Sequence, residues 1–268
     1  APGYFANYDV VPAARVSPQS VLSEFTGATI TPNTPARWDN SVAYTGMFSG
    51  LTVRAIYATL NEENVTRPVN GNWEETTGAE DDDAMGLSLD YSNGPLKVGA
   101  VYHYLKSSDT VRLGNATTGF ATANADDQQE WLVGGSYDFG VLTLAGSYQQ
   151  VKNSFIVVGL VVDVYQLGVI VPVGAAGNVH VAYGEADAEF GNADGKTSAY
   201  TIAYTHALSK RTTAYVGYMG TDNDDGLGIS LVKGTSLAGT AVDLANGTES
   251  FESGEKSNLV TVGVRHTF

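Results

Sequence analysis

Apolar and polar residues alternate with a period of two along most of this chain, from about Ser41 to the C-terminus. Successive side chains of a β-strand point to opposite faces of its sheet, so each strand has one apolar and one polar face. In the segment 96–104 one face is leucine, valine, alanine and tyrosine, and the other carries Lys97, Gly99 and His103, with Val101 as the exception. Helix signals are weak throughout. The chain is therefore predicted to be all-β.

The connections between the expected strands alternate between short and long. Period-two segments separated by such connections predict about eleven strands in an antiparallel meander. Tight turns on one side and long polar loops on the other are typical of hairpins that cross a bilayer. Short turns are expected at 48–50, 93–95, 139–140, 174–178 and 210–211, long loops at about 62–83, 107–127 and 222–256, and two smaller loops near 152–160 and 191–196.

Alternation alone leaves two fold classes open, because a soluble β-sandwich or solenoid also alternates and turns its apolar face into a core. Three features favour a membrane barrel. The less apolar face is rich in Gly, Ala, Ser and Thr rather than in Lys and Glu, and acidic residues crowd into a loop at 74–83. Tyrosines gather near strand ends, where an interfacial girdle would lie: Tyr57, Tyr102, Tyr104, Tyr148, Tyr204 and Tyr218.

Charge and cysteine content exclude several classes of function. With 14 Lys plus Arg against 29 Asp plus Glu, the net charge is -15, which would repel a nucleic-acid backbone. The chain has no cysteine, so it has no disulfide, no thiol nucleophile and no cysteine metal site. No apolar run approaches the roughly 20 residues that a membrane-spanning helix needs.

Catalytic and metal-binding motifs are also missing from the sequence. The four histidines fall on separate expected strands, without a nucleophile elbow or a nearby acidic partner in sequence. The acidic runs 81–83 and 222–225 carry oxygen ligands that suit Ca²⁺, but neither has the spacing of an EF-hand. We therefore expect solvated acidic loops, no cofactor, no bound metal and no enzymatic activity.

Four segments carry a resemblance to a known family. They are the closing strand Gly263–Phe268, the turn Ala207–Tyr215 (ALSKRTTAY), the hairpin Asp90–Leu96 (DYSNGPL) and the strand pair between Arg37 and Leu51. Together they resemble the general trimeric porins of Gram-negative bacteria, especially the β-proteobacterial branch. In that family a C-terminal phenylalanine, here Phe268, is the assembly signal.

The resemblance implies a sixteen-stranded antiparallel transmembrane barrel whose third outer loop folds inward and narrows the lumen. It places residues 1–35 as this constriction loop and residues 36–268 as strands and loops of the same single domain, 1–268. Eleven of the sixteen strands are then visible, and we expect a missing N-terminal piece of ~100 residues, at about 20 residues per strand and connection. An independent argument agrees: an open sheet edge in hydrocarbon leaves unpaired backbone groups, and bacterial barrels close with an even number of strands.

The function implied is passive diffusion of small hydrophilic solutes and ions through a water-filled channel. Selectivity then depends on lumen width and on charges at the constriction. The resemblance suggests Arg37 as a wall arginine, and alternation places Arg54 on the face of Thr52 and Ile56. The loop candidates are Asp9, Arg15 and Glu24, for which a locally satisfied surface charge is the alternative, and Arg265 is expected inward near the inner rim.

The expected partners are the bilayer and lipopolysaccharide of a Gram-negative outer membrane, two further copies in a homotrimer, and small polar solutes and ions. Nucleic acid is not expected as a partner. The alternative function is that of a non-transporting surface or secreted β-protein, adhesin-like. The sequence leaves the preference for anions or cations open.

Overall fold

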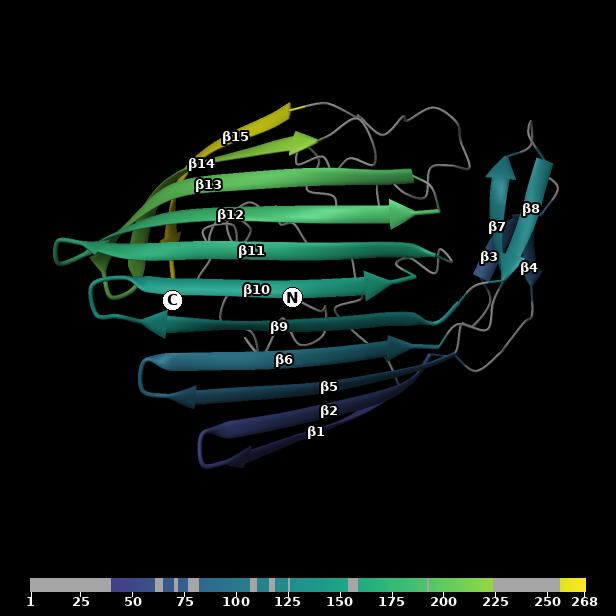
Figure 1. Cartoon of the computed structure of the whole chain (residues 1–268), viewed down its shortest axis with the longest axis horizontal. Coiled ribbons are helices and arrows are strands. Elements are labelled where there is room, and N and C mark those ends of the chain that lie inside the picture. Colours follow the sequence, from purple (N-terminus) through teal and green to yellow (C-terminus); the bar gives the residue numbers. More distant parts are fainter. Residues whose placement is uncertain are drawn as a thin grey trace.

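The chain forms one broad, curved antiparallel sheet (Figure 1). The computed structural model describes residues 40–60, 65–69, 72–76, 82–106, 110–115, 119–124, 126–153, 159–191, 193–223 and 256–268. Its eleven strands follow each other in chain order, each paired with its neighbour in sequence within the sheet. They are β1 Ser41–Phe48, β2 Leu51–Leu60, β5 Asp82–Asn93, β6 Leu96–Leu105, β9 Gln128–Asp138, β10 Thr143–Lys152, β11 Leu160–Val173, β12 Gly177–Phe190, β13 Ala193–Ser209, β14 Thr212–Asn223 and β15 Lys256–His266.

The predicted all-β meander of eleven strands is confirmed, and the described part of the chain contains no helix long and apolar enough to span a membrane. The sheet is not closed, since β1 and β15 lie at its two ends without pairing to each other in the described residues. Along the strands, buried and more exposed side chains alternate, as the sequence pattern predicts. On β9, for example, buried Glu130 and Leu132 are separated by the half-buried Trp131 and followed by the exposed Val133.

Tight turns join the strands at one end of the sheet, which we call the short-turn end. Ser49 and Gly50 link β1 to β2 with φ values of 47° and 89°, the sign that both central residues of a type I′ hairpin turn require. A side chain at position 50 would also meet the carbonyl oxygen of Ser92 at 2.9 Å. Glycine is therefore needed at this position for backbone conformation and for space.

The opposite end of the sheet, the long-loop end, differs from the sequence prediction in two ways. The expected polar loops at 62–83 and 107–127 contain short hairpins, β3 Val65–Val69 with β4 Asn72–Thr76, and β7 Thr110–Asn115 with β8 Gly119–Asn124. Figure 1 shows both hairpins beyond the strand ends of the main sheet. The small loop predicted at 191–196 is wrong, because β12 continues to Phe190 and β13 already begins at Ala193.

Candidate functional site

The two faces of the sheet differ in burial. We call the face that carries the buried side chains the inward face and the opposite one the outward face, and the inward face is the candidate functional surface. Side chains directly opposite each other in neighbouring strands lie on the same face. Ile56, Ala58 and Ala84, all buried, therefore mark one face across β2 and β5, and the exposed Tyr57 and Met85 mark the other. Most of the large apolar side chains are on the exposed face, which is the reverse of a soluble sandwich. The exposed face is therefore the one suited to lipid.

The outward face is arranged in layers along the strands. Near the long-loop ends, aromatic rings of neighbouring strands touch: Trp131 lies edge-on to Tyr148 with centroids 4.7 Å apart, and Tyr148 lies 4.7 Å from Tyr165. Toward the short-turn end a second aromatic pair, Tyr137 and Phe139, has centroids 4.6 Å apart. Aliphatic residues lie between these levels. Two aromatic levels that flank an apolar zone form the interfacial girdles of a bilayer-spanning barrel.

Polar groups beyond the aromatic level mark the long-loop rim. Lys196 forms ion pairs with Glu185 at 2.7 Å and with Asp187 at 3.3 Å, and Lys256 pairs with Asp222 at 2.6 Å. These residues alternate onto the outward face at the ends of β12 to β15. The rim is thus both charged and cross-linked by ion pairs, as expected where strands leave the hydrocarbon for the headgroup layer.

On the inward face, Arg54 of β2 forms an ion pair with Asp90 of β5, and their side chains are 15% and 20% exposed. The strand register explains the contact, because Thr52 lies opposite Asp90 and Arg54 lies opposite Ser88. The sequence prediction that Arg54 faces the interior with Thr52 and Ile56 agrees with this register. Arg54 and Asp90 therefore form a fixed dipole, in which the positive charge of the guanidinium is balanced by a neighbouring carboxylate.

A second polar cluster on the inward face is deeply buried and was not found from the sequence. Gln149 of β10 donates a hydrogen bond to Glu130 of β9 at 2.5 Å, and His103 of β6 lies 3.4 Å from the other carboxylate oxygen. All three side chains are almost completely removed from solvent. Alternation had placed His103 on the less apolar face. Its partner depends on the β6–β9 register, across a long connection that sequence alone does not define.

The other predicted site residues are only partly within the described structure. Arg37, Asp9, Arg15 and Glu24 lie outside the described residues. Arg265 is exposed on β15 and lies opposite Thr213, on the inward face. Phe268 is exposed at the short-turn end, where its ring contacts His266 and the neighbouring Thr267 N–H donates to the carbonyl of Arg211 at 2.9 Å.

Asp222 of the expected acidic runs and the histidines of the sheet have structural partners. Asp222 pairs with Lys256, and no group of three His, Asp or Glu side chains in the described residues is arranged to hold a metal. His180 bonds Thr205, His206 bonds Tyr204 and His266 bonds Thr212, each at 2.9 Å. These contacts tie neighbouring residues within the sheet, and none of them joins a serine and a carboxylate into a triad.

An antiparallel meander with aromatic girdles on its outward face and polar groups on its inward face is typical of an outer-membrane β-barrel protein. Comparison with known proteins identifies its family: residues 3–226 match the Gram-negative porins, and the chain belongs to this family. The protein is located in the outer membrane of a Gram-negative bacterium. The resemblance inferred from the four sequence segments is thus confirmed.

Two relatives of this chain are also outer-membrane porins. The chain is 32% identical over 186 residues to outer membrane porin protein 32 of Delftia acidovorans, covering 69% of this chain and 46% of that protein. It is 26% identical over 205 residues to an outer membrane porin of Bordetella pertussis, covering 67% of this chain and 51% of that protein. The chain spans about half the length of these curated relatives.

Solved structures share the architecture. An anion-selective porin from Comamonas acidovorans has a TM-score of 0.59 and 26% identity, over 87% of this chain and 60% of that one. OmpT of Vibrio cholerae has a TM-score of 0.57 at 16% identity, over 91% of this chain and 72% of that one. The second likeness supports the fold alone.

Proposed function

We propose that the complete protein forms a water-filled channel for passive diffusion of small hydrophilic solutes and ions across the outer membrane. The main observation in support is the difference between the two faces. Most of the large apolar and aromatic side chains point outward, while Arg54 and Asp90 form a partly exposed ion pair inside. Such a sheet has its lipid-type surface on the outside and a surface that water and ions can use on the inside.

A closed barrel needs more strands than the eleven of this sheet. The exposed edge strand β1 and the other edge strand, β15, each have one described neighbour only. Backbone groups left open in hydrocarbon cost several kcal/mol each, so both edges must be paired in the membrane. We expect five further strands that complete a sixteen-stranded barrel, with 1–268 as part of one domain and 1–35 as its constriction loop.

Planar-bilayer recording with the full-length protein, purified from its membrane, tests the channel directly. Stepwise, ohmic conductance increases are expected, and they should be absent when a matched preparation lacks the protein. A correctly folded protein that inserts without conductance would support the adhesin-like alternative and overturn the channel. A non-enzymatic role follows from the same proposal, since selectivity in such a channel depends on width and fixed charge.

Selectivity is proposed to depend on charges at the constriction. Arg37 and Arg54 would supply positive charge on the wall, and Asp9, Arg15 and Glu24 would face them from the loop. The Comamonas porin at 26% identity is anion-selective, which favours a wall of the same sign here. Arg37→Ala should reduce anion preference in a salt-gradient reversal potential, and an unchanged potential would remove Arg37 from the constriction.

Assembly as a homotrimer and contact with lipopolysaccharide are further parts of the proposal. The charged long-loop rim, with Lys196 and Lys256 among carboxylates, supports contact with a phosphate-bearing headgroup layer. Heat-modifiable migration tests the assembly: unboiled protein should migrate as a trimer in SDS and boiled protein as a monomer. Deleting Phe268, the proposed assembly signal, should lower the amount of trimer in the membrane, whereas an unchanged amount contradicts that role.

A further inference from the structure

The described charges at the short-turn end are opposite in sign to the charge of the whole chain, which is -15. We count the turns at this end, the two strand residues next to each turn, the last two residues of β15 and those after it. They include one acid, Asp138, and four bases, all of them exposed: Lys97, Lys210, Arg211 and Arg265. The Oδ1 atom of Asp138 accepts the N–H of Gly140 at 2.7 Å and so caps the β9–β10 turn. Four bases less one acid leave this end with three excess positive charges.

Charges in the long-loop half of the sheet are distributed differently. From β10 to β15 the described strands carry there six acids and three lysines, which are Asp163, Glu185, Asp187, Glu189, Asp194 and Asp222, and Lys152, Lys196 and Lys256. The register places all nine on the outward face, away from the lumen. The inward side chains of this half are mostly buried, such as Val162 of β11 at 1% exposure. Within the described residues, the exposed inward charges therefore lie toward the short-turn end.

Lys97 is the inward base on one side of this end. It is the second residue of β6 and lies opposite Ser92 of β5 and Ser136 of β9, on the inward face. Its side chain is exposed, and no ion pair of this lysine lies within the described residues. The nearest inward carboxylate of β5, Asp90, is already paired with Arg54. The ammonium group of Lys97 is therefore available to ions in the water of the lumen.

Arg265 is the inward base on the other side of this end. It lies opposite Thr213, one residue before the end of β15. In the sheet order β15 is seven positions from β6, and strands on opposite sides of the proposed sixteen-stranded barrel are about eight positions apart. The β13–β14 turn, which carries Lys210 and Arg211, lies beside β15, because the N–H of Thr267 donates to the carbonyl of Arg211 at 2.9 Å. The bases therefore flank the opening at this end, which we call the short-turn mouth, from two sides.

We propose that the short-turn mouth, around Lys97, Arg211 and Arg265, concentrates small inorganic anions such as chloride and phosphate. This step rests on the proposed channel and adds a second charged site to the constriction. Like charges around a pore mouth raise the local concentration of counter-ions. Their field extends over one Debye length, about 10 Å in 0.1 M salt and about 3 Å in 1 M salt. Current should therefore be larger when anions are driven in through this mouth than when they are driven in through the other, and high salt should remove the difference.

Single-channel recording of the full-length protein at low salt tests the direction of conduction. With the short-turn side at negative potential, which drives anions into this mouth, the current should exceed that at the opposite potential. Lys97→Glu should reduce this asymmetry, and Lys97→Glu with Arg265→Glu should reduce it further. The matched control, Lys152→Glu, makes the same charge change on the outward face of β10 and should leave the asymmetry unchanged. A symmetric unaltered channel, an unchanged asymmetry in the double variant, or an asymmetry that persists in 1 M salt overturns the proposal.

Thiol modification supplies a second readout, because the sequence has no cysteine and Lys97→Cys introduces a single one. The folded protein in vesicles is treated with an anionic or a cationic methanethiosulfonate, added to one side, and the side of faster reaction is the short-turn side. The ratio of the anionic to the cationic rate should be about tenfold higher in 0.01 M salt than in 1 M salt. Adding Arg265→Gln should lower the ratio at low salt. A ratio that does not depend on salt overturns the proposal.

The modification rates also separate this inference from the channel itself. If the unaltered protein does not conduct, the proposed function fails, while the rates at position 97, which need only a folded protein, still decide whether the mouth attracts anions. Asp138→Asn tests the sign from the other direction, since asparagine keeps an oxygen for the N–H of Gly140 and removes the negative charge. It should raise the ratio of anionic to cationic rates, and a fall in the ratio contradicts the proposal. Far-UV circular dichroism confirms that each variant is folded.

Discussion

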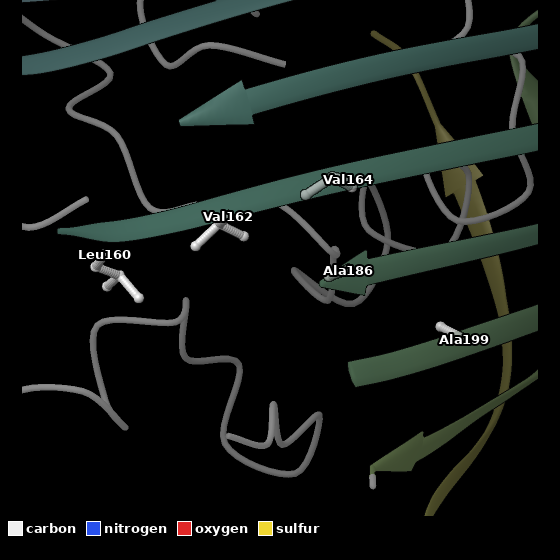
Figure 2. Packing of buried hydrophobic residues seen from close by; sticks show 5 residues of the cluster. All are labelled: Leu160, Val162, Val164, Ala186 and Ala199. Carbon is white, nitrogen blue, oxygen red and sulfur yellow. The ribbon is translucent and has the colours of Figure 1, made fainter. Parts of the chain in front are cut away.

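Two regions of the inward face follow the same alternation and yet have opposite surroundings. On β2 and β5, Arg54 and Asp90 form an ion pair that keeps partial contact with solvent. On β11 to β13, the cluster of apolar side chains that we call the apolar wall is almost completely buried; it consists of Leu160, Val162, Val164, Ala186 and Ala199 (Figure 2). Strand geometry alone decides only that these residues face inward. What they do there depends on the residue types, charged in one region and apolar in the other.

The comparison shows that a barrel's inner surface is not one environment. A charged, partly wet wall can orient water and ions, because opposite charges held side by side create a fixed local field. An apolar wall cannot do this, because it carries no fixed charge. If the proposed channel is correct, ions should therefore interact with the β2–β5 region of this sheet more strongly than with the β11–β13 region.

The largest difference in stability is expected when a negative charge is introduced into each of the two inward regions. Val162→Asp puts an unpaired carboxylate into the apolar wall and should destabilise the folded protein by about 3–5 kcal/mol, the usual cost of an uncompensated buried charge. Ser92→Asp, exposed on the inward face of β5, should change stability by at most about 0.5 kcal/mol. Guanidinium unfolding in detergent, followed by tryptophan fluorescence, measures both. Equal effects would mean that the two walls are equally wet.

A charge on the outward face extends the same comparison to lipid. Leu167→Arg on β11 should cost about 2–4 kcal/mol in a bilayer, the range for arginine near the midplane of a lipid-facing strand. Val161→Arg, at the long-loop end of the same face of β11, should cost less, at most about 1 kcal/mol. Unfolding in phospholipid vesicles measures the difference. A smaller loss at Leu167 than at Val161 would place the midplane elsewhere along the strands.

How far the sequence predicts this molecule can be judged from particular residues. The period of two predicted the strands and the facing of Arg54, because facing depends on local geometry alone. It could not predict the ion pair of Arg54 with Asp90 or the contact of Glu130 with Gln149, which depend on inter-strand register. It also missed the short hairpins β3–β4 and β7–β8, since polar segments without clear alternation resemble loops.

The apolar wall was missed for a different reason. Apolar residues in a period-two pattern were expected to face lipid, but β11 reads Leu-Val-Val-Asp-Val at 160–164, with valine on both faces. A strand that is apolar on both faces signals cover on both faces. The sequence of 160–164 therefore contains a signal of packing on the inside, which the analysis of alternation did not use. The identities of Asp9, Arg15, Glu24 and Arg37 as constriction charges stay predictions.

An intermediate loss of stability is expected at the buried polar cluster of His103, Glu130 and Gln149. Its strands, β6, β9 and β10, lie in the sheet between the two inward regions. Glu130→Ala leaves the amide of Gln149 without its described acceptor and should destabilise the protein by about 1–3 kcal/mol, the cost of an unsatisfied buried polar group. Glu130→Gln keeps an oxygen in place and should cost clearly less. Guanidinium unfolding of both variants is the measurement. A larger loss for Glu130→Gln would show that the negative charge, rather than the hydrogen bond, stabilises the cluster.

The smallest loss of stability is expected at Arg54 and Asp90, where the main effect should be on ion selectivity. Because both side chains keep solvent contact, breaking the pair should cost only about 0.2–1 kcal/mol. Arg54→Ala leaves a negative wall and should shift the reversal potential toward cation preference, whereas Asp90→Ala leaves a positive wall and should shift it toward anion preference. The double variant removes both charges and should return the potential close to that of the unaltered channel. If neither single variant moves the potential, ions do not pass along this wall, and the functional contrast between the two inward regions fails even though their difference in burial remains.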